Sequence, residues 1–208
     1  MPYPKLFEKY FNVVNFDPNL RRFIMAELSS EDRAWHGLVH HAIMLNEVAE
    51  QFRLIKGEEI RDLPTYQPIV DGLVATFFHD IVYDATRTDN EEASAATMKL
   101  WLDPNRYDVP LIEDMILRTK EHRIEGSWSM RNFLLADMSI LWTYNPQLYL
   151  FYARGIRKEY RHVPNDVWRE RRPAVLRQLV SGSINHRRQA NQNIELEIKM
   201  INEGAFDL

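Results

Sequence analysis

The pattern of apolar and polar positions along the chain is that of one helix after another. Runs of alternating β-branched residues, which are typical of strands, are absent, and only 7 of the 208 residues are glycine. The pattern predicts helices over the following ranges: Pro4–Val13, Pro18–Leu28, Ser30–Ile55, Tyr66–Tyr83, Asn90–Leu102, Pro110–His122, Ser129–Trp142, Pro146–Tyr160, Asn165–Ser181 and His186–Asn202.

Residues that favour helix starts agree with these ranges. Pro110, Pro146 and Pro164 stand where a helix can begin without losing a needed N–H. Ser30 and Asn90 are each followed by two acidic residues, which favour the first turn of a helix. Since no repeat or low-complexity linker interrupts the chain, we expect a single all-α helical bundle over residues 1–208. Its motif-bearing core is expected at about 30–145, with C-terminal helices at 146–204 packing on it.

One apolar stretch, from Asn132 to Ala153, is long enough to span a bilayer and carries a single charged residue, Asp137. A carboxylate inside a bilayer is costly, and Asn145-Pro146 is typical of a helix start. We therefore expect two buried helices joined by a short turn rather than a membrane span.

Composition excludes several classes of protein. The chain is 45% hydrophobic and 12% aromatic, which is enough to build a core. Its net charge of −4 argues against generic nucleic-acid binding and against binding to a membrane surface through basic residues. Without Cys it has no disulfide, no thiolate nucleophile and no Cys-bound zinc. No secretory signal is visible, so we expect a cytoplasmic protein. These features do not predict an oligomeric state.

Four ionisable residues lie within or beside apolar runs. His79 and Asp80 follow the run GLVATFF, His40 lies in the predicted helix before it, and Asp137 lies within LLADMSIL. Buried ionisable groups need partners, and one shared divalent cation would satisfy all four. Two nitrogens and two carboxylates suit Mn, Ni, Co, Fe, Mg or Zn without selecting one of them. The structural alternatives are a hydrogen-bonded core His and an Asp that caps a helix or forms an ion pair.

The H…HD…D order of these residues resembles the signature of the HD-domain superfamily of metal-dependent phosphohydrolases. More narrowly, the chain resembles a family of predicted HD phosphohydrolases of similar length, from roughly Ala34 to Glu197. Its longest matching motif is FFHDIVYDATRTDNEEASA, which is similar to WFHDxVYDxxxxDNExxSA. Shorter ones are WHGLVHH beside YHNLxHI, RTKEH beside ATKHH, and LADMSIL beside DADLxIL.

The resemblance implies an all-α fold in which the four residues named above bind the metal between helices. By analogy with related cyclic-nucleotide phosphodiesterases, it implies that His36 is the proton donor. The chain departs from the family at Gly37, which replaces the Asn of YHN, and at Leu135, which replaces the first Asp of DAD. Glu121 replaces the first His of ATKHH, so a second metal would need Glu121 or His122 instead.

The expected activity is hydrolysis of a phosphomonoester or phosphodiester, such as a nucleotide, by metal-activated water. Asp80 or Glu91 would accept the proton of the water, and His36 would protonate the leaving oxygen. Asp84 and Glu91 follow the metal pair in the sequence and are candidates for supporting its ligands. The alternative for both acids is capping of the helix that begins at Asn90.

Basic residues outnumber acidic ones between Arg154 and Arg188. Arg172 from this stretch, together with Lys120, is a candidate for holding phosphate oxygens. The alternative for the basic stretch is a set of solvated helix faces. Two other functions also stay open. One is a non-catalytic module that binds metal or ligand, and the other is a di-iron oxygenase of HD type, which the Glu121 replacement weakens.

Overall fold

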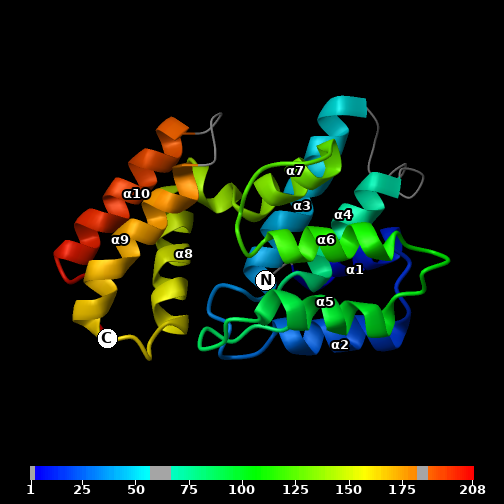
Figure 1. Ribbon diagram of the computed structural model, residues 1–208, viewed down its shortest axis with the longest axis horizontal. Coiled ribbons are helices and arrows are strands. Elements are labelled where there is room, and N and C mark those ends of the chain that lie inside the picture. The colour runs from blue at the N-terminus through cyan, green and yellow to red at the C-terminus, as the bar shows by residue number, and fades with distance from the viewer. Residues whose placement is uncertain (1–2, 57–66, 182–186) are drawn as a thin grey trace. The chain divides into compact units, whose positions relative to one another are not determined.

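The computed structural model describes residues 3–56, 67–181 and 187–208, and Figure 1 shows the helices that these parts of the chain form. No strand occurs within them, which confirms the predicted all-α fold. The elements are α1 (Tyr3–Val13), α2 (Pro18–Leu28), α3 (Leu38–Lys56), α4 (Gln67–Phe78), α5 (Asn90–Trp101), α6 (Val109–Arg118), α7 (Trp128–Asp137), the short 3₁₀ helix η2 (Ser139–Trp142), α8 (Pro146–Glu159), α9 (Asn165–Ser181) and α10 (Arg187–Asn202).

The chain divides into two compact units, Met1–Asp137 and Met138–Leu208. The first contains α1 to α7, and the second contains η2 and α8 to α10. The expectation of a single domain over residues 1–208 stays a prediction.

Helix α4 is the centre of the first unit. Every residue from Ile69 to Phe78 is buried, because α4 packs against α3, α5, α6 and α7. Burial on all sides explains why the run GLVATFF has no polar face. Near the end of α4 the ring of Phe77 stacks on that of Phe11, with centroids 4.7 Å apart. This packing fixes the point from which His79 and Asp80 continue.

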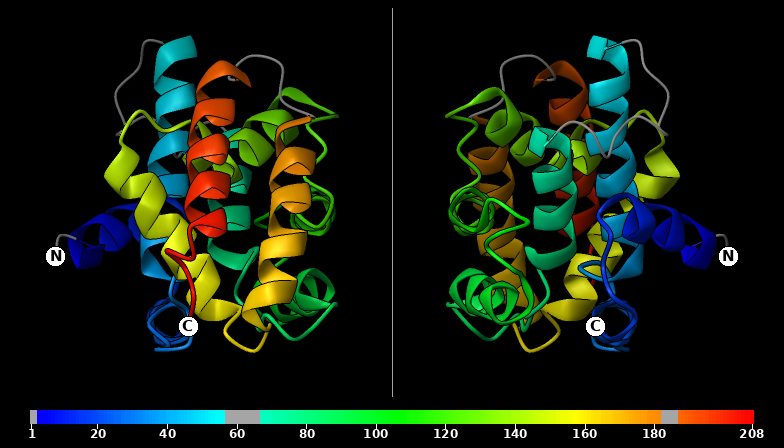
Figure 2. Two further views of the ribbon diagram at one scale, coloured as in Figure 1. Left: turned by 90° about the vertical axis from the view of Figure 1, so that its left-hand side faces the viewer. Right: turned by 90° about the vertical axis from the view of Figure 1, so that its right-hand side faces the viewer.

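In the second unit, α10 packs against α8, α9 and η2, and Figure 2 shows α9 and α10 running side by side. A buried ion pair joins these two helices: Arg172 Nε donates to Glu197 Oε1 at 2.9 Å. The hydroxyl of Tyr149 donates to the other Glu197 oxygen at 2.7 Å, and Arg172 also donates to Tyr152 at 2.9 Å. This network links α8, α9 and α10.

Most predicted helices agree closely with the observed ones, but the one predicted from Ser30 begins only at Leu38. Turns precede it, in which the N–H of Arg33 donates to the Ser30 carbonyl. The physical reason lies at Gly37, where a Cβ would stand 2.8 Å from the carbonyl oxygen of Leu28 at the end of α2. This close approach requires glycine, whose low helix propensity favours a place before the helix rather than within it.

The apolar stretch from Asn132 to Ala153 is divided among α7, η2 and α8. The predicted break between two helices is thereby confirmed. Among the helices of the described ranges, none combines the length and the hydropathy needed to cross a membrane.

Candidate metal centre

Three helices of the first unit bring the predicted metal ligands together. His40 lies in the first turn of α3, and Asp137 is the last residue of α7. His79 and Asp80 directly follow the end of α4. Helices α3, α4 and α7 all pack against one another. The four side chains therefore meet although they lie far apart in the sequence.

The donor atoms of these four residues are closely spaced. The Nε2 atoms of His40 and His79 are 3.0 Å apart. Asp80 Oδ2 lies 3.0 Å from His79 Nε2 and 3.7 Å from His40 Nε2. Asp137 Oδ1 lies 3.1 Å from His40 Nε2 and 3.7 Å from His79 Nε2. His40, His79 and Asp80 form a group that could hold a metal ion, and Asp137 approaches the same two imidazoles.

These separations fit a metal site. Two ligand atoms about 2.1 Å from one ion are about 3.0 Å apart at a right angle and about 3.4 Å apart at a tetrahedral angle. The observed distances of 3.0 to 3.7 Å cover both values. Imidazole and carboxylate are also ligands that divalent metals accept. The residues present therefore fit a divalent cation but do not select one metal.

A backbone contact orients His79 for this role. Its Nδ1 lies 2.9 Å from the carbonyl oxygen of Thr76. An N–H at Nδ1 donates to that carbonyl, so Nε2 is the ring nitrogen that faces the other donors. The cluster is also buried, since the side chains of His40 and Asp137 are only 4% and 8% exposed. Buried polar groups need partners, and a cation would be one that all four share.

Charges within the cluster hold both carboxylates ionised. Burial alone would lower the pKa of His79, but Asp80 and Asp137 outweigh burial and raise that pKa to about 9. Burial opposes the ionised forms of Asp80 and Asp137, yet the neighbouring imidazoles lower the pKa of both carboxyls well below the usual value. Burial lowers the pKa of His40. Ionised carboxylates and neutral imidazoles are the forms that bind metals. A metal bound here would therefore displace the proton that a pKa of about 9 keeps on His79.

Glu121 and His122, the two candidate ligands of a second metal, lie on the same turn. His122 contacts the cluster, whereas the Glu121 side chain is exposed. His122 Nε2 lies 3.3 Å from Oδ2 of Asp137. The backbone of His122 is left-handed, with φ at 51°, a conformation in which His is enriched. Glu121 pairs instead with Arg123 at 3.2 Å, where both side chains are largely exposed.

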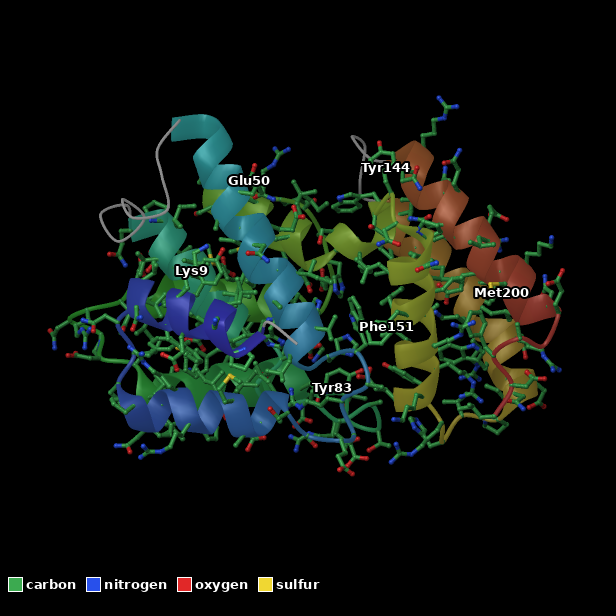
Figure 3. All side chains as sticks on the ribbon, turned by 180° about the vertical axis from the view of Figure 1, so that it is seen from behind. Lys9, Glu50, Tyr83, Tyr144, Phe151 and Met200 are labelled. Carbon is green, nitrogen blue, oxygen red and sulfur yellow. The ribbon has the colours of Figure 1, made fainter. Side chains whose placement is uncertain are left out.

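His36, the predicted proton donor, lies in the turn before α3 and is half-buried. Its ring stacks on Tyr83, with centroids 4.1 Å apart, and meets the ring of His40 edge-on at 5.7 Å. Figure 3 shows Tyr83 beside the start of α3. His36 therefore adjoins the cluster without being one of its closely spaced donors, and its role as an acid stays a prediction.

The loop after the metal pair is fixed to α5. The Ser94 hydroxyl bonds both the N–H and the carbonyl of Val82 at 3.1 Å. The Asn90 amide likewise bonds the N–H and the carbonyl of Asp84, at 3.1 and 2.9 Å. The Asp84 carboxylate itself accepts hydrogen bonds from the N–H and hydroxyl of Thr86. These bonds show Asp84 stabilising its own loop, and support of the metal ligands by Asp84 stays a prediction.

The remaining predicted residues are engaged in ion pairs. Lys120 Nζ lies 2.5 Å from Glu92 and 3.7 Å from Glu91. A phosphate contact by Lys120 and a base role for Glu91 stay predictions. Arg172 lies in the second unit, where Glu197 compensates its buried charge. The structure therefore shows Arg172 in a buried ion pair, and its phosphate contact stays a prediction.

Sequence reasoning missed several residues around the cluster. Arg33 donates to the backbone carbonyl of Asp80, and no residue pattern reveals a bond to a backbone atom. His41 is fully buried, and its ring centroid lies 4.9 Å from that of His79. The role of Asn90 did leave a signal in the sequence. In the DNEEAS segment a polar residue stands directly before an acidic first helical turn, a position from which its side chain can bond to the preceding loop.

Comparison of the chain with protein-family models, curated proteins and solved structures found no match. The residues of the cluster and the motifs around them are therefore what bears on function.

Proposed function

We propose that the protein is a metal-dependent phosphohydrolase of HD type that acts on a small phosphate ester such as a nucleotide. The observation that carries this proposal is the cluster of His40, His79, Asp80 and Asp137. Its two imidazole Nε2 atoms lie 3.0 Å apart, and each lies 3.0 to 3.7 Å from an oxygen of both carboxylates. The order of these residues along the chain is that of the HD signature. A cytoplasmic location is part of the same proposal.

His40, His79, Asp80 and Asp137 would hold the divalent cation, which would supply Lewis acidity towards a phosphoryl oxygen and a bound water. The chain's own residues move the protons. Ionised Asp80 accepts a proton from the attacking water, and Glu91 on α5 is the other candidate base. His36 adjoins the cluster and donates a proton to the leaving oxygen. Burial of the ligands strengthens every electrostatic contact made to the phosphate.

Metal analysis of the purified protein, followed by a screen of phosphate esters with Mn²⁺, Ni²⁺, Co²⁺ and Mg²⁺, tests the proposal. We expect bound metal, and turnover that a chelator abolishes. Bound metal with no turnover on nucleoside mono-, di- and triphosphates, cyclic nucleotides and aryl phosphates would favour the non-catalytic module. Two bound irons with an absorbance that responds to reductant would favour the oxygenase, although the outward position of Glu121 gives that alternative no support.

A further inference from the structure

Arg33 has an unusual environment for a charged residue. Its side chain is only 5% exposed. One terminal nitrogen, Nη1, donates to the backbone carbonyls of Asp80 and of His36, the latter at 3.2 Å. The other, Nη2, donates to the carbonyl of Ile81 at 2.7 Å. The guanidinium therefore bonds to three main-chain oxygens from two segments of the first unit.

A buried cation is costly unless its surroundings compensate it. One acid near Arg33 is Glu27, whose oxygen lies 4.0 Å away and whose side chain is 45% exposed. Asp80 and Ile81 follow the end of α4, where the helix dipole places partial negative charge. The planar fork of arginine can bond two adjacent carbonyls at once, which a lysine ammonium does less well.

The two segments that Arg33 joins carry different parts of the candidate site. His36 lies in the turn before α3, and Asp80 follows α4. The backbone of His36 and the backbone of Asp80 are thus held by the same nitrogen atom, Nη1. A displacement of either segment would change the distance between the Asp80 carboxylate and the imidazole of His36. A displacement of the segment after α4 would also move Asp80 away from the metal.

We infer that Arg33 is a positioning residue, which fixes the Asp80 ligand and the proton donor His36 relative to one another. The inference rests on the proposed function. The contacts that assign this role to Arg33 are those with main-chain oxygens. Its effect is geometric, and displacements of about 1 Å in such sites can cost about 10²-fold in rate.

Arg33→Gln and Arg33→Lys test this inference against a matched control, Arg21→Gln. Arg21 also belongs to the first unit and donates to a backbone carbonyl, that of Phe16, at 2.7 Å. Its other contacts are with Glu8, Asn12 and the carbonyl and ring of Phe11. All three variants lose hydrogen bonds to the backbone, so all are expected to unfold at a lower temperature. Thermal stability alone therefore does not separate positioning from a merely structural role.

The decisive measurement is the Kd for Mn²⁺, by competition with a chelator, on folded full-length protein. We expect Arg33→Gln to weaken Mn²⁺ binding by about 10- to 100-fold, as loss of a group that orients a ligand does, and Arg21→Gln to leave it unchanged. Arg33→Lys keeps the charge without the fork, so its binding should also be weakened. At saturating Mn²⁺, both Arg33 variants should lose more rate on an alkyl phosphate than on nitrophenyl phosphate.

The outcomes separate this inference from the proposed function. If the wild type binds no Mn²⁺, the proposed metal centre is wrong and the inference falls with it. If the wild type binds Mn²⁺ while Arg33→Gln and Arg21→Gln have the same Kd, only the inference is wrong. Full recovery by Arg33→Lys would show that charge, rather than geometry, is what the site needs, and would also overturn it. Should Arg33→Gln fail to fold, Arg33→Lys alone decides the comparison.

Discussion

The Asp80 carboxylate lies within 3.0 Å of His79 Nε2 and 3.7 Å of His40 Nε2. Asp80→Ala removes one ligand and leaves the two imidazole nitrogens, 3.0 Å apart, without its charge. We expect the variant to lose its bound metal and to unfold at a lower temperature, because metal binding and folding are coupled. Elemental analysis after dialysis, together with a thermal melt, measures both effects.

Asp114→Ala is the matched control for this substitution. Asp114 is about half exposed and pairs with Arg118 one helical turn away, so its loss should leave the metal content unchanged. Full metal occupancy in Asp80→Ala would show that the ion is bound elsewhere on the chain.

His36 and His40 should differ in role although their rings touch edge-on. His40→Ala should lose metal and activity together. His36→Ala should keep its metal while its rate falls by about 10²- to 10⁴-fold, the usual contribution of one positioned proton donor. The loss should shrink for nitrophenyl phosphate, whose leaving group departs without a proton. Steady-state rates at equal metal occupancy measure this difference.

The competing role for His36 is packing against Tyr83, on which its ring stacks. Under that role His36→Ala would cost stability, while its rate per folded molecule would be unchanged for both kinds of leaving group. Equal rates of wild type and variant on the poor leaving group would therefore end the assignment of His36 as the acid.

At the residue scale, the sequence predicted which four side chains lie close together. It did not predict which of two adjacent residues, Glu121 or His122, has its side chain directed towards them. His40, His79, Asp80 and Asp137 could be selected because each is an ionisable group in apolar surroundings. The motif RTKEH does not show that His122 contacts Asp137 while Glu121 pairs with Arg123. That outcome goes with a left-handed backbone at His122, where φ is 51°.

At the element scale, the ion pair between α9 and α10 offers a test of stability. Glu197 is 1% exposed and is the acid that Arg172 contacts at 2.9 Å. Glu197→Ala leaves the buried guanidinium without its counter-charge, so we expect a loss of about 3–5 kcal/mol in the free energy of unfolding. Denaturant unfolding followed by circular dichroism measures it.

A double variant, Arg172→Met with Glu197→Leu, controls for the loss of packing. It removes both charges and should recover most of the lost stability, because an apolar pair of similar volume often equals a buried ion pair. Exposed ion pairs contribute at most about 1 kcal/mol to the free energy of unfolding. If Glu197→Ala loses less than that, water reaches the pair and the expectation is wrong.

Helix positions were predictable where a local rule decides them. Asn145 caps α8 through its side chain and Pro146 follows it, so the break in the apolar stretch could be read from two residues. The start of α3 could not, because Gly37 is needed for contact with the carbonyl of Leu28. That requirement comes from tertiary packing, which local propensity does not contain.

At the scale of the whole molecule, the pattern of apolar and polar positions predicted the all-α class but not its division into units. The helical pattern runs without a linker through the boundary between Asp137 and Met138. All four candidate ligands nevertheless lie in the first unit, whose last residue is the ligand Asp137. The four proposed metal ligands therefore lie within one compact unit.

This placement predicts how a metal changes the stability of the full chain. A ligand that binds only the folded state stabilises it by about 2.7 kcal/mol when free metal is at about 100 times its Kd. For a chain of this size, each kcal/mol of added stability raises the Tm by about 2–4 °C. Mn²⁺ at that concentration should therefore raise the Tm by about 5–11 °C. Calorimetry of chelator-treated protein, with and without Mn²⁺, measures the shift.

The shift must depend on the cluster if the ligand assignment is right. Asp80→Ala should melt at the same temperature with and without Mn²⁺, since it lacks a ligand that lies 3.0 Å from His79. Asp114→Ala should respond as the wild type does, because its carboxylate pairs only with Arg118 among the contacts described. An equal rise in Tm for all three proteins would mean that Mn²⁺ acts through other sites, since stabilisation by a ligand requires the site that binds it.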